Sequence, residues 1–286
     1  MLDFDQLWNY NNPAETKQKF RELLPKAEAG DDASYHAQLL TQIARTLGLQ
    51  RKFDEAHQTL DIVEPMLTDE LETARIRYLL ERGRAFNSSG KKDQAHPLFL
   101  EAWERTKAAK EDFYAVDAAH MLGIVETGEA SLDWNMQAIA YAEQSEQPRA
   151  RNWLGSLYNN TGWTYHDMGE YEKALDLFER ALAFRQAQGN PENIRIARWC
   201  MARCFRSLGR NGEALEIQLA LLEESKQASD SAGYTHEELG ELYLQAGKKE
   251  KATPHFSAAY EELSKDPWLV ENEPERIERL KVLGKG

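Results

Sequence analysis

The sequence predicts an all-α protein built from six stacked helical hairpins, and three observations lead to this prediction. Apolar residues recur at i, i+3, i+4 and i+7, which is the spacing of an amphipathic helix. No alternating run of β-branched residues, as in a strand, competes with that pattern. Small, aromatic and Gly positions also return every 38–40 residues. A period of this length indicates stacked repeats rather than one folded core.

The repeat register is clearest in the unit from Asn152 to Gln188. A small residue opens the same position of all six units: Ala44, Gly83, Gly123, Gly162, Ala202 and Gly240. Twelve residues further on stand Ala56, Ala95, Asn135, Ala174, Ala214 and Ala252. The large position just beyond reads Leu60, Phe99, Ile139, Phe178, Gln218 and Phe256. Helices approach within ~8–10 Å where the crossing residues are small, so we expect each small residue to face the Ala of the second helix.

Glycines and prolines mark where helices begin and end. Four glycines lie between the paired helices, where the left-handed conformation ends a helix: Gly90, Gly169, Gly209 and Gly247. Pro97 and Pro254 fall early in their second helices and predict a local kink or a late helix start. Pro25 predicts a break inside an amphipathic segment from Pro13 to Ala29, and Pro274 predicts the start of a last helix.

These positions resemble the tetratricopeptide repeat, over about residues 34–271. The period near 39 is longer than the family's usual 34, as in kinesin light chain and bacterial peptide receptors. Glu126, Asn135 and Gln218 depart from the pattern. The resemblance implies one right-handed superhelical solenoid, with capping helices in residues 1–33 and 272–286, although length alone suggests two domains. It also implies a concave groove lined by the first helix of each pair.

The resemblance places a set of candidate peptide-binding residues in that groove. They are Arg45, Arg77, Arg84, His120, Asn159, Asn160, Trp163, Trp199, Arg203 and Arg206. Arginine suits bidentate binding of carboxylates or phosphates, and the two tryptophans fall outside the packing seam, as in an interface hot spot. The alternative is that the arginines only solvate helix faces and the tryptophans pack between neighbouring repeats.

The charge distribution favours an anionic partner. The chain has a net charge of −13, yet residues 149–210 carry ten basic and six acidic side chains. Such a segment between acidic arms should attract an acidic ligand. An acidic chain overall is a poor binder of nucleic acid, and no apolar stretch approaches the ~20 residues of a membrane span. The acidic N-terminal residues do not match a signal peptide, so we expect a cytoplasmic protein, and a monomer.

Motifs that would carry catalysis are missing from the sequence. It has no His-Glu-x-x-His, no phosphate-binding Gly-x-x-x-x-Gly-Lys, no Gly-x-Ser-x-Gly and no dinucleotide fingerprint. Histidines are scattered without metal-ligand spacing, and we expect neither metal nor cofactor. Cys200 and Cys204 lie four residues apart and could bind a soft metal or respond to oxidation, but we favour small buried residues.

The sequence therefore predicts a non-enzymatic scaffold or adaptor. Its concave groove would bind a segment of a partner protein, acidic or ending in a carboxylate. The alternative is a regulatory sensor whose groove binds a small peptide or metabolite and thereby controls a partner.

Overall fold

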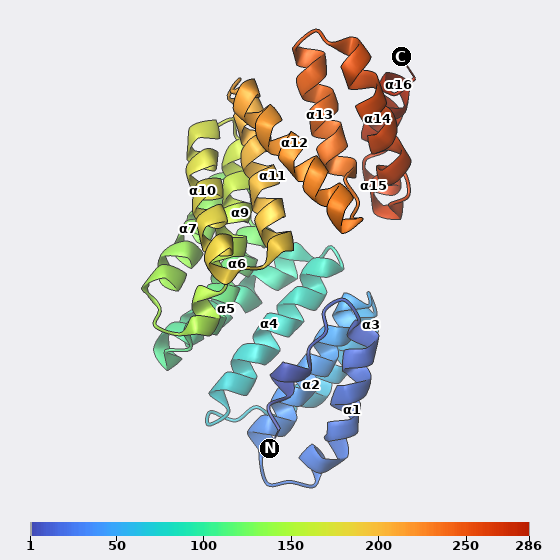
Figure 1. The fold of residues 1–286 in the computed structure, drawn as a ribbon. Helices are drawn as coiled ribbons and strands as arrows, with labels where there is room; N and C mark the ends of the chain where they lie inside the picture. The colour runs from blue at the N-terminus through green and yellow to red at the C-terminus, as the bar shows by residue number, and fades with distance from the viewer. Residues whose placement is uncertain (1, 286) are drawn as a thin grey trace. The chain divides into compact units, whose positions relative to one another are not determined.

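The structure is a computed structural model that describes residues 2–285. Helices make up most of these residues and none of them forms a strand, which confirms the all-α prediction (Figure 1). The described chain contains six consecutive helix pairs: α2 (Ala33–Leu49) with α3 (Phe53–Val63), α4 (Glu72–Ser88) with α5 (Lys92–Ala109), α6 (Asp112–Val125) with α7 (Gly128–Gln144), α9 (Leu154–Asp167) with α10 (Tyr171–Gln188), α11 (Pro191–Ser207) with α12 (Asn211–Ala228), and α13 (Gly233–Gln245) with α14 (Lys249–Leu263).

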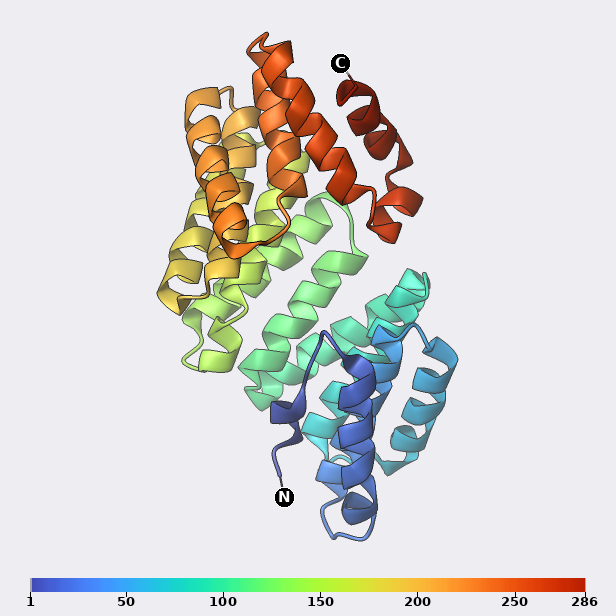
Figure 2. The same cartoon turned by 45° about the vertical axis from the view of Figure 1, so that its right-hand side comes forward.

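Shorter or terminal segments complete the described chain. They are the 3-10 turn η1 (Phe4–Leu7), α1 (Pro13–Glu28), the 3-10 turn η2 (Glu64–Met66), α8 (Pro148–Arg151), α15 (Pro267–Asn272) and α16 (Pro274–Leu283). The last helix begins at Pro274, as its sequence predicts, and packs beside α14 (Figure 2). The sequence pattern did not indicate α8 or η1.

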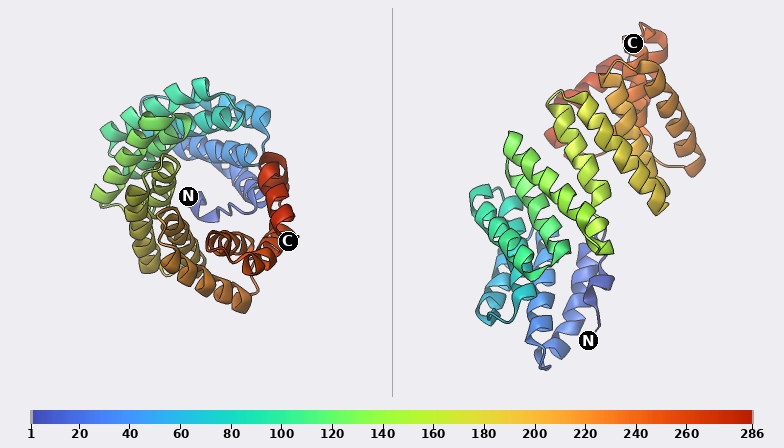
Figure 3. Two further views of the ribbon diagram at one scale, coloured as in Figure 1. Left: turned by 90° about the horizontal axis from the view of Figure 1, so that it is seen from above. Right: turned by 90° about the vertical axis from the view of Figure 1, so that its left-hand side faces the viewer.

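The chain divides into two compact units, Met1–Leu157 and Tyr158–Gly286. The first unit holds α1 to α8, and the second holds α10 to α16. Within each unit the two helices of a pair run antiparallel (Figure 3). In residues 2–285, no helix is both long enough and apolar enough to cross a membrane.

The seam inside several hairpins depends on a close contact between the small and large positions. A Cβ added to Gly83 would lie 2.5 Å from Cε1 of Phe99, and one added to Gly162 would lie 2.7 Å from Cε1 of Phe178. Both rings are fully buried. In the hairpin of α6 and α7 the contact is the expected one, since a Cβ added to Gly123 would lie 2.6 Å from Oδ1 of Asn135, at the Ala position. In the hairpins of Gly83 and Gly162 the small residue instead contacts the large aromatic ring of the second helix. Only Gly leaves room for these rings.

The helix ends follow most of the sequence signals. The four predicted turn glycines all have positive φ: Gly90, Gly169, Gly209 and Gly247. The predicted late start at the prolines is wrong, because α5 and α14 begin five residues before Pro97 and Pro254, and α1 likewise continues through Pro25. The carbonyls that lose a bond to Pro97 and Pro254 belong to the exposed first-turn residues Asp93 and Glu250. Water can bind such carbonyls, so the helix tolerates the loss.

Candidate functional site

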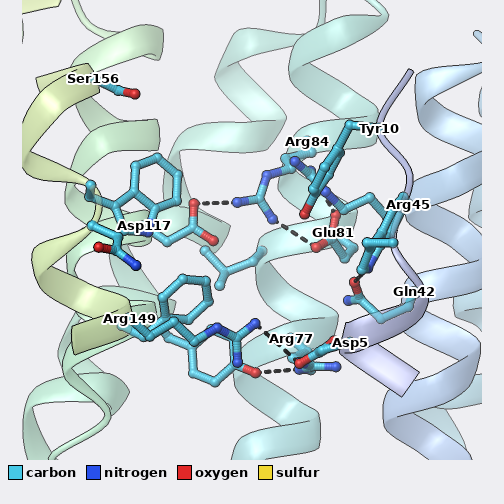
Figure 4. A pocket seen from close by; sticks show the side chains of 16 residues that line it. Asp5, Tyr10, Gln42, Arg45, Arg77, Glu81, Arg84, Asp117, Arg149 and Ser156 are labelled. Atoms are coloured by element: carbon cyan, nitrogen blue, oxygen red, sulfur yellow. Dashed lines mark hydrogen bonds and ion pairs between the residues drawn. The ribbon is translucent and has the colours of Figure 1, made fainter. Parts of the chain in front are cut away.

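The first unit contains a pocket of about 410 Å³ on the face formed by α2, α4, α6 and α8 (Figure 4). Helical spacing brings Arg77, Glu81 and Arg84 to one face of α4, since residues three or four apart are neighbours. The pocket is lined by Asp5, Trp8, Tyr10, Gln42, Arg45, Arg77, Leu80, Glu81, Arg84, Phe113, Tyr114, Asp117, Arg149, Asn152, Trp153 and Ser156. Three of the sequence-predicted residues, Arg45, Arg77 and Arg84, therefore meet here.

Arg84 lies at the centre of an ion-pair network in this pocket. Its Nη1 donates to Glu81 Oε1 at 2.8 Å, and its Nη2 donates to Asp117 of α6. Glu81 also accepts from Arg45 Nη1 at 3.2 Å. Burial lowers the pKa of Arg84, but Asp117 and Glu81 raise it by more, so the pKa lies above its ordinary value. These arginines stay charged and hold three hairpins together through carboxylates.

Arg77 is the most deeply buried arginine of the pocket, with 4% of its surface exposed. Its Nε donates to the Tyr114 hydroxyl, and its Nη2 donates to the carboxylate of Asp5. Its Nη1 is buried and has no hydrogen-bond partner among residues 2–285. A buried guanidinium N–H without a hydrogen-bond partner costs stability. This Nη1 is therefore a donor that an anionic group would satisfy.

Arg149 is the accessible cation of the pocket, since 53% of its side chain is exposed. It comes from α8, lies 3.8 Å above the Phe113 ring and donates from Nη2 to Asp5 Oδ2 at 3.1 Å. The helices thus contribute four arginines to the pocket and only two carboxylates, Glu81 and Asp117. The third carboxylate, Asp5, comes from the N-terminal segment. A positive excess beside aromatic walls suits an acidic residue next to an aromatic one.

A second cavity of about 350 Å³ shares five lining residues with the first: Arg45, Glu81, Arg84, Asp117 and Trp153. Here lies His120, another sequence-predicted residue, with its ring 5.2 Å from that of Trp153. Burial lowers the pKa of His120. Its Nδ1, and Oδ1 of Asn87, are buried without a partner among the described residues. The two cavities together therefore present unused hydrogen-bonding atoms along the first unit.

The aromatic candidates of the second unit are largely engaged in packing. Trp163 and Trp199, from consecutive hairpins, have ring centroids 6.0 Å apart, and Trp163 also meets the core ring of Phe178 at 5.2 Å. Asn159 accepts a hydrogen bond from Cys200 at 3.1 Å, while Asn160 is exposed. Packing within and between repeats thus engages both tryptophans, and Nε1 of Trp199 is buried without a hydrogen-bond partner among the described residues.

The second unit also has a cavity, of about 610 Å³, among α11, α12 and α13. Trp199, Ile196 and Tyr234 give it an apolar wall, and the last two are about half exposed. At the edge of this cavity, Arg195 forms an ion pair with Asp230 at 2.7 Å. This cavity has no arginine excess, which separates it chemically from the pocket of the first unit.

Carboxylates that follow the predicted basic segment in sequence neutralise several of its positive charges. Arg206 makes a bidentate contact with Glu238 at 2.7 and 3.0 Å, and Arg203 reaches the same carboxylate at 3.1 Å. Burial lowers the pKa of Arg203 by more than Glu238 raises it. Arg198 pairs likewise with Glu224 at 2.6 Å. The positive stretch at 149–210 is therefore not a free positive surface in the folded second unit.

The two cysteines are buried and unpaired, as the packing interpretation predicts. Burial raises the pKa of Cys200 to about 12 and that of Cys204 to about 11. Thiols with such values stay protonated near neutral pH and react poorly. No group of three metal-ligating side chains occurs within the described part of the chain.

Sequence reasoning missed Asp5, Trp8, Tyr114 and the particular role of Arg149. Arg149 was counted in the basic segment, but α8 was not predicted, so nothing placed its side chain. Asp5 is 72 residues from Arg77 and 144 from Arg149, and no repeat pattern covers it. Its one local signal is a position beside Phe4 and near Trp8, which makes the N-terminal segment more apolar than a solvated tail.

Known proteins share this architecture. A family model described as the tetratricopeptide repeat matches residues 156–186. The apo form of RapI has a TM-score of 0.73 at 14% identity, over 97% of this chain and 84% of its own. A STAND signal-transduction ATPase with a tetratricopeptide repeat sensor, from Pyrococcus horikoshii, also reaches 0.73, at 15% identity over 96% of this chain and 44% of its own. No curated protein matches in sequence.

Kinesin light chain repeats from Podosopora anserina give a TM-score of 0.56 at 16% identity, over 70% of this chain and 99% of theirs. Identities this low show the fold alone. Together with the family match on one repeat, these neighbours show that this chain has a tetratricopeptide-repeat type of fold. The resemblance seen in the sequence is thereby confirmed. The fold is one suited to protein interaction or sensing.

Proposed function

We propose that this protein is a non-enzymatic adaptor whose first unit binds an extended, acidic peptide segment of a partner. The observation that carries the proposal is the pocket itself, where four helix-borne arginines face only two helix-borne carboxylates beside aromatic rings. A carboxylate of the partner would balance this excess, because arginine binds carboxylates through paired N–H donors. Unpartnered atoms of Arg77, His120 and Asn87 offer further hydrogen bonds.

A protein partner fits the chemistry better than a nucleic acid. Most arginines of the second unit that would meet phosphates are engaged by Glu238, Glu224 and Asp230. A strongly acidic chain would also repel a polyanion. We place the protein in the cytoplasm as a monomer, where buried unpaired thiols such as Cys200 and Cys204 persist.

Sensing is the second candidate function. The observation that favours it is that residues of the N-terminal segment already line the pocket, so that a ligand entering there changes the contacts of that segment. A structural neighbour is described as carrying a tetratricopeptide repeat sensor, which is consistent with such a use of the fold. In this reading a small peptide or metabolite, rather than a stable partner protein, enters the groove.

Selection from a library of short random peptides tests the adaptor function. We expect enrichment of peptides that contain Asp or Glu near an aromatic residue. Binding of a selected peptide, followed by fluorescence anisotropy, should weaken about tenfold in Arg149→Ala, since a charge-assisted hydrogen bond contributes about 1.5 kcal/mol. Binding should also weaken as salt rises.

The matched control is Arg21→Ala, which removes an exposed arginine of α1 away from the pocket. It should leave the affinity unchanged. The adaptor function is contradicted if no acidic peptide is enriched, or if Arg21→Ala weakens binding as much as Arg149→Ala. Binding of a small metabolite in a separate ligand screen, with no acidic peptide enriched, would instead support the sensor.

A further inference from the structure

The N-terminal segment, residues 2–12, reaches into the arginine-lined pocket of the first unit (Figure 4). It enters as the 3-10 turn η1 and continues to Asn12, just before α1. Asp5, Trp8 and Tyr10 of this segment form part of the pocket lining. The segment is short and largely non-helical, so its place is decided by its side-chain contacts.

Three anchors hold the segment there. Asp5 accepts from Arg77 and, at 3.1 Å, from Arg149. Trp8 donates from Nε1 to Gln42 Oε1 at 3.1 Å. The third anchor is Phe4, which is 5% exposed and makes edge-on contacts with core rings. The chain's own segment therefore places a carboxylate in the pocket, followed three positions later by an aromatic residue.

Parts of the segment lie at the surface. Leu2 and Tyr10 are more than half exposed. The following helix does not depend on the segment, because α1 has its own N-cap, in which Asn12 accepts from the backbone N–H of Glu15 at 3.2 Å. Thr16 holds the backbone of Asn9, so the connection to α1 is fixed from Asn9 onward. The N-cap of α1 therefore does not depend on the polar contacts of residues 2–8 in the pocket, while Phe4 and Trp8 pack against Phe20 of α1.

Asp5 does not occupy every hydrogen-bond donor of Arg77. It takes Nη2 of Arg77, whereas Nη1 is buried without a partner among the described residues. A carboxylate that met both nitrogens would form the bidentate pair that arginine favours. A ligand carboxylate that reached both nitrogens would therefore make one contact with Arg77 that Asp5 does not make.

We propose that residues 2–8 are a tethered self-ligand, and that the partner is an extended peptide whose Asp or Glu replaces Asp5 on Arg77 and Arg149. An aromatic residue three positions later takes the place of Trp8 against Gln42. The inference rests on the proposed function and deepens it, since it assigns the partner's chemistry and a means of closing the site. Because residues 2–8 are joined to α1, their effective concentration at the pocket is about millimolar. Only a peptide of matching chemistry therefore displaces them.

The test uses the full chain and a fluorescein-labelled synthetic peptide with the sequence of residues 2–12. Wild type is compared with Asp5→Asn combined with Trp8→Ala, in which the tethered copy loses both polar anchors. We expect the peptide to bind the double variant at least tenfold more tightly than wild type. An otherwise identical peptide with Asp5→Asn should lose that binding. Asp31→Asn, an exposed carboxylate outside the pocket, is the matched control and should behave as wild type.

Circular dichroism of each variant shows whether it keeps its helices, and hydrogen exchange gives an independent readout. Saturating labelled peptide should raise the exchange of the tethered residues 2–8 in wild type, where the chain's own copy is displaced. The proposal is overturned if a folded double variant binds the peptide no better than wild type, or if neither binds it. It is also overturned if residues 2–8 exchange equally with and without peptide.

The two proposals fail in different ways. Binding of the residue 2–12 peptide by the double variant, with no acidic peptide enriched from the random library on wild type or on the double variant, would keep the self-ligand and remove the adaptor function. Enriched acidic peptides whose affinity is the same in wild type and in the double variant would keep the adaptor function and remove the self-ligand.

Discussion

Arginines on the first helix of one hairpin repeatedly meet carboxylates on the first helix of the next. Arg45 pairs with Glu81, Arg84 with Asp117 and Arg206 with Glu238, at separations of 36, 33 and 32 residues. Each pair is partly buried, so either partner alone would be an uncompensated charge. Charge reversal at Arg84 or Arg206 would therefore break the fold before it reported on ligand binding. The exposed Arg149 is the better probe.

Glu238 tests this view directly, because two arginines share it. Glu238→Gln removes the charge but keeps the size of the side chain. We expect a loss of about 2–4 kcal/mol of stability, since Arg203 and Arg206 lose their buried counterion. Urea denaturation measures it. Glu213→Gln, which breaks the fully exposed pair with Arg210, should cause no measurable change. Equal effects of the two variants would contradict a structural role for Glu238.

A pair of histidines in the second unit makes stability depend on pH. Nδ1 of His236 lies 2.9 Å from Nδ1 of His255, so one ring must donate to the other and both cannot be protonated without repulsion. Tyr243 stacks on His255, and Lys226 and Glu262 are the nearby charges. Burial, followed by His236 and Lys226, lowers the pKa of His255 from 6.5 to about 4.

The lowered pKa means that the unfolded state binds more protons between pH 6.5 and 4. Stability is therefore full above pH 6.5 and falls as the pH drops toward 4. We expect this site to account for a loss of about 1–2 kcal/mol across that window, allowing for partial exposure. Thermal melts of wild type and His255→Gln at several pH values measure this loss. The difference between the two proteins at pH 7 gives the effect of the substitution on packing and is subtracted. An unchanged slope in the variant would show that the loss arises elsewhere.

At the scale of the helix pair, Gln218 is the residue that fits its position worst. It stands where other hairpins have Leu60, Phe99 or Phe256, and it is fully buried. Neither polar atom of its side chain has a hydrogen-bond partner among the described residues. We expect Gln218→Met to stabilise the protein by about 1–2 kcal/mol, because a methionine of similar size removes the cost of the unpaired amide.

Chemical denaturation of wild type and Gln218→Met measures this gain in stability. Gln227→Met is the control, because Gln227 is an exposed residue near the end of the same helix. It should change stability little. A loss of stability in Gln218→Met would indicate that the buried amide contributes to packing in a way that an apolar side chain cannot replace.

At the scale of the molecule, the division into two compact units predicts that damage stays local. In repeat proteins stability is roughly a sum of units and their neighbours. Gly83→Ala forces a Cβ against Phe99 in the first unit, and Gly240→Ala does so against Phe256 in the second. Overpacking of this kind costs about 1–3 kcal/mol. Hydrogen exchange by mass spectrometry should show each variant loosening mainly the helices of its own unit.

Gly48→Ala and Gly212→Ala are matched controls in the first and second unit, because no atom lies within 4 Å of an added Cβ at either position. Both should leave exchange unchanged or slow it slightly, since alanine favours helices over glycine. Equal loosening of both units by Gly83→Ala would mean that the whole chain unfolds as one cooperative body.

The sequence by itself determined the helices, their pairing and the tetratricopeptide-repeat type of fold. These features depend on contacts between residues close in sequence, such as Gly162 with Phe178, and six repeated units make the pattern visible. The predicted groove residues were partly gathered by the same register, which brings Arg45, Arg77 and Arg84 to one pocket. The register could not tell which of them were already paired.

Only the tertiary structure decided the site's chemistry. Whether an arginine is free or paired depends on which carboxylate the next hairpin places beside it. The N-terminal segment occurs once, outside the repeats, so no periodic signal could place Asp5 on Arg77 and Arg149. Its position follows from charge and shape across 72 and 144 residues of chain. Long-range complementarity of this kind is a property of the folded unit.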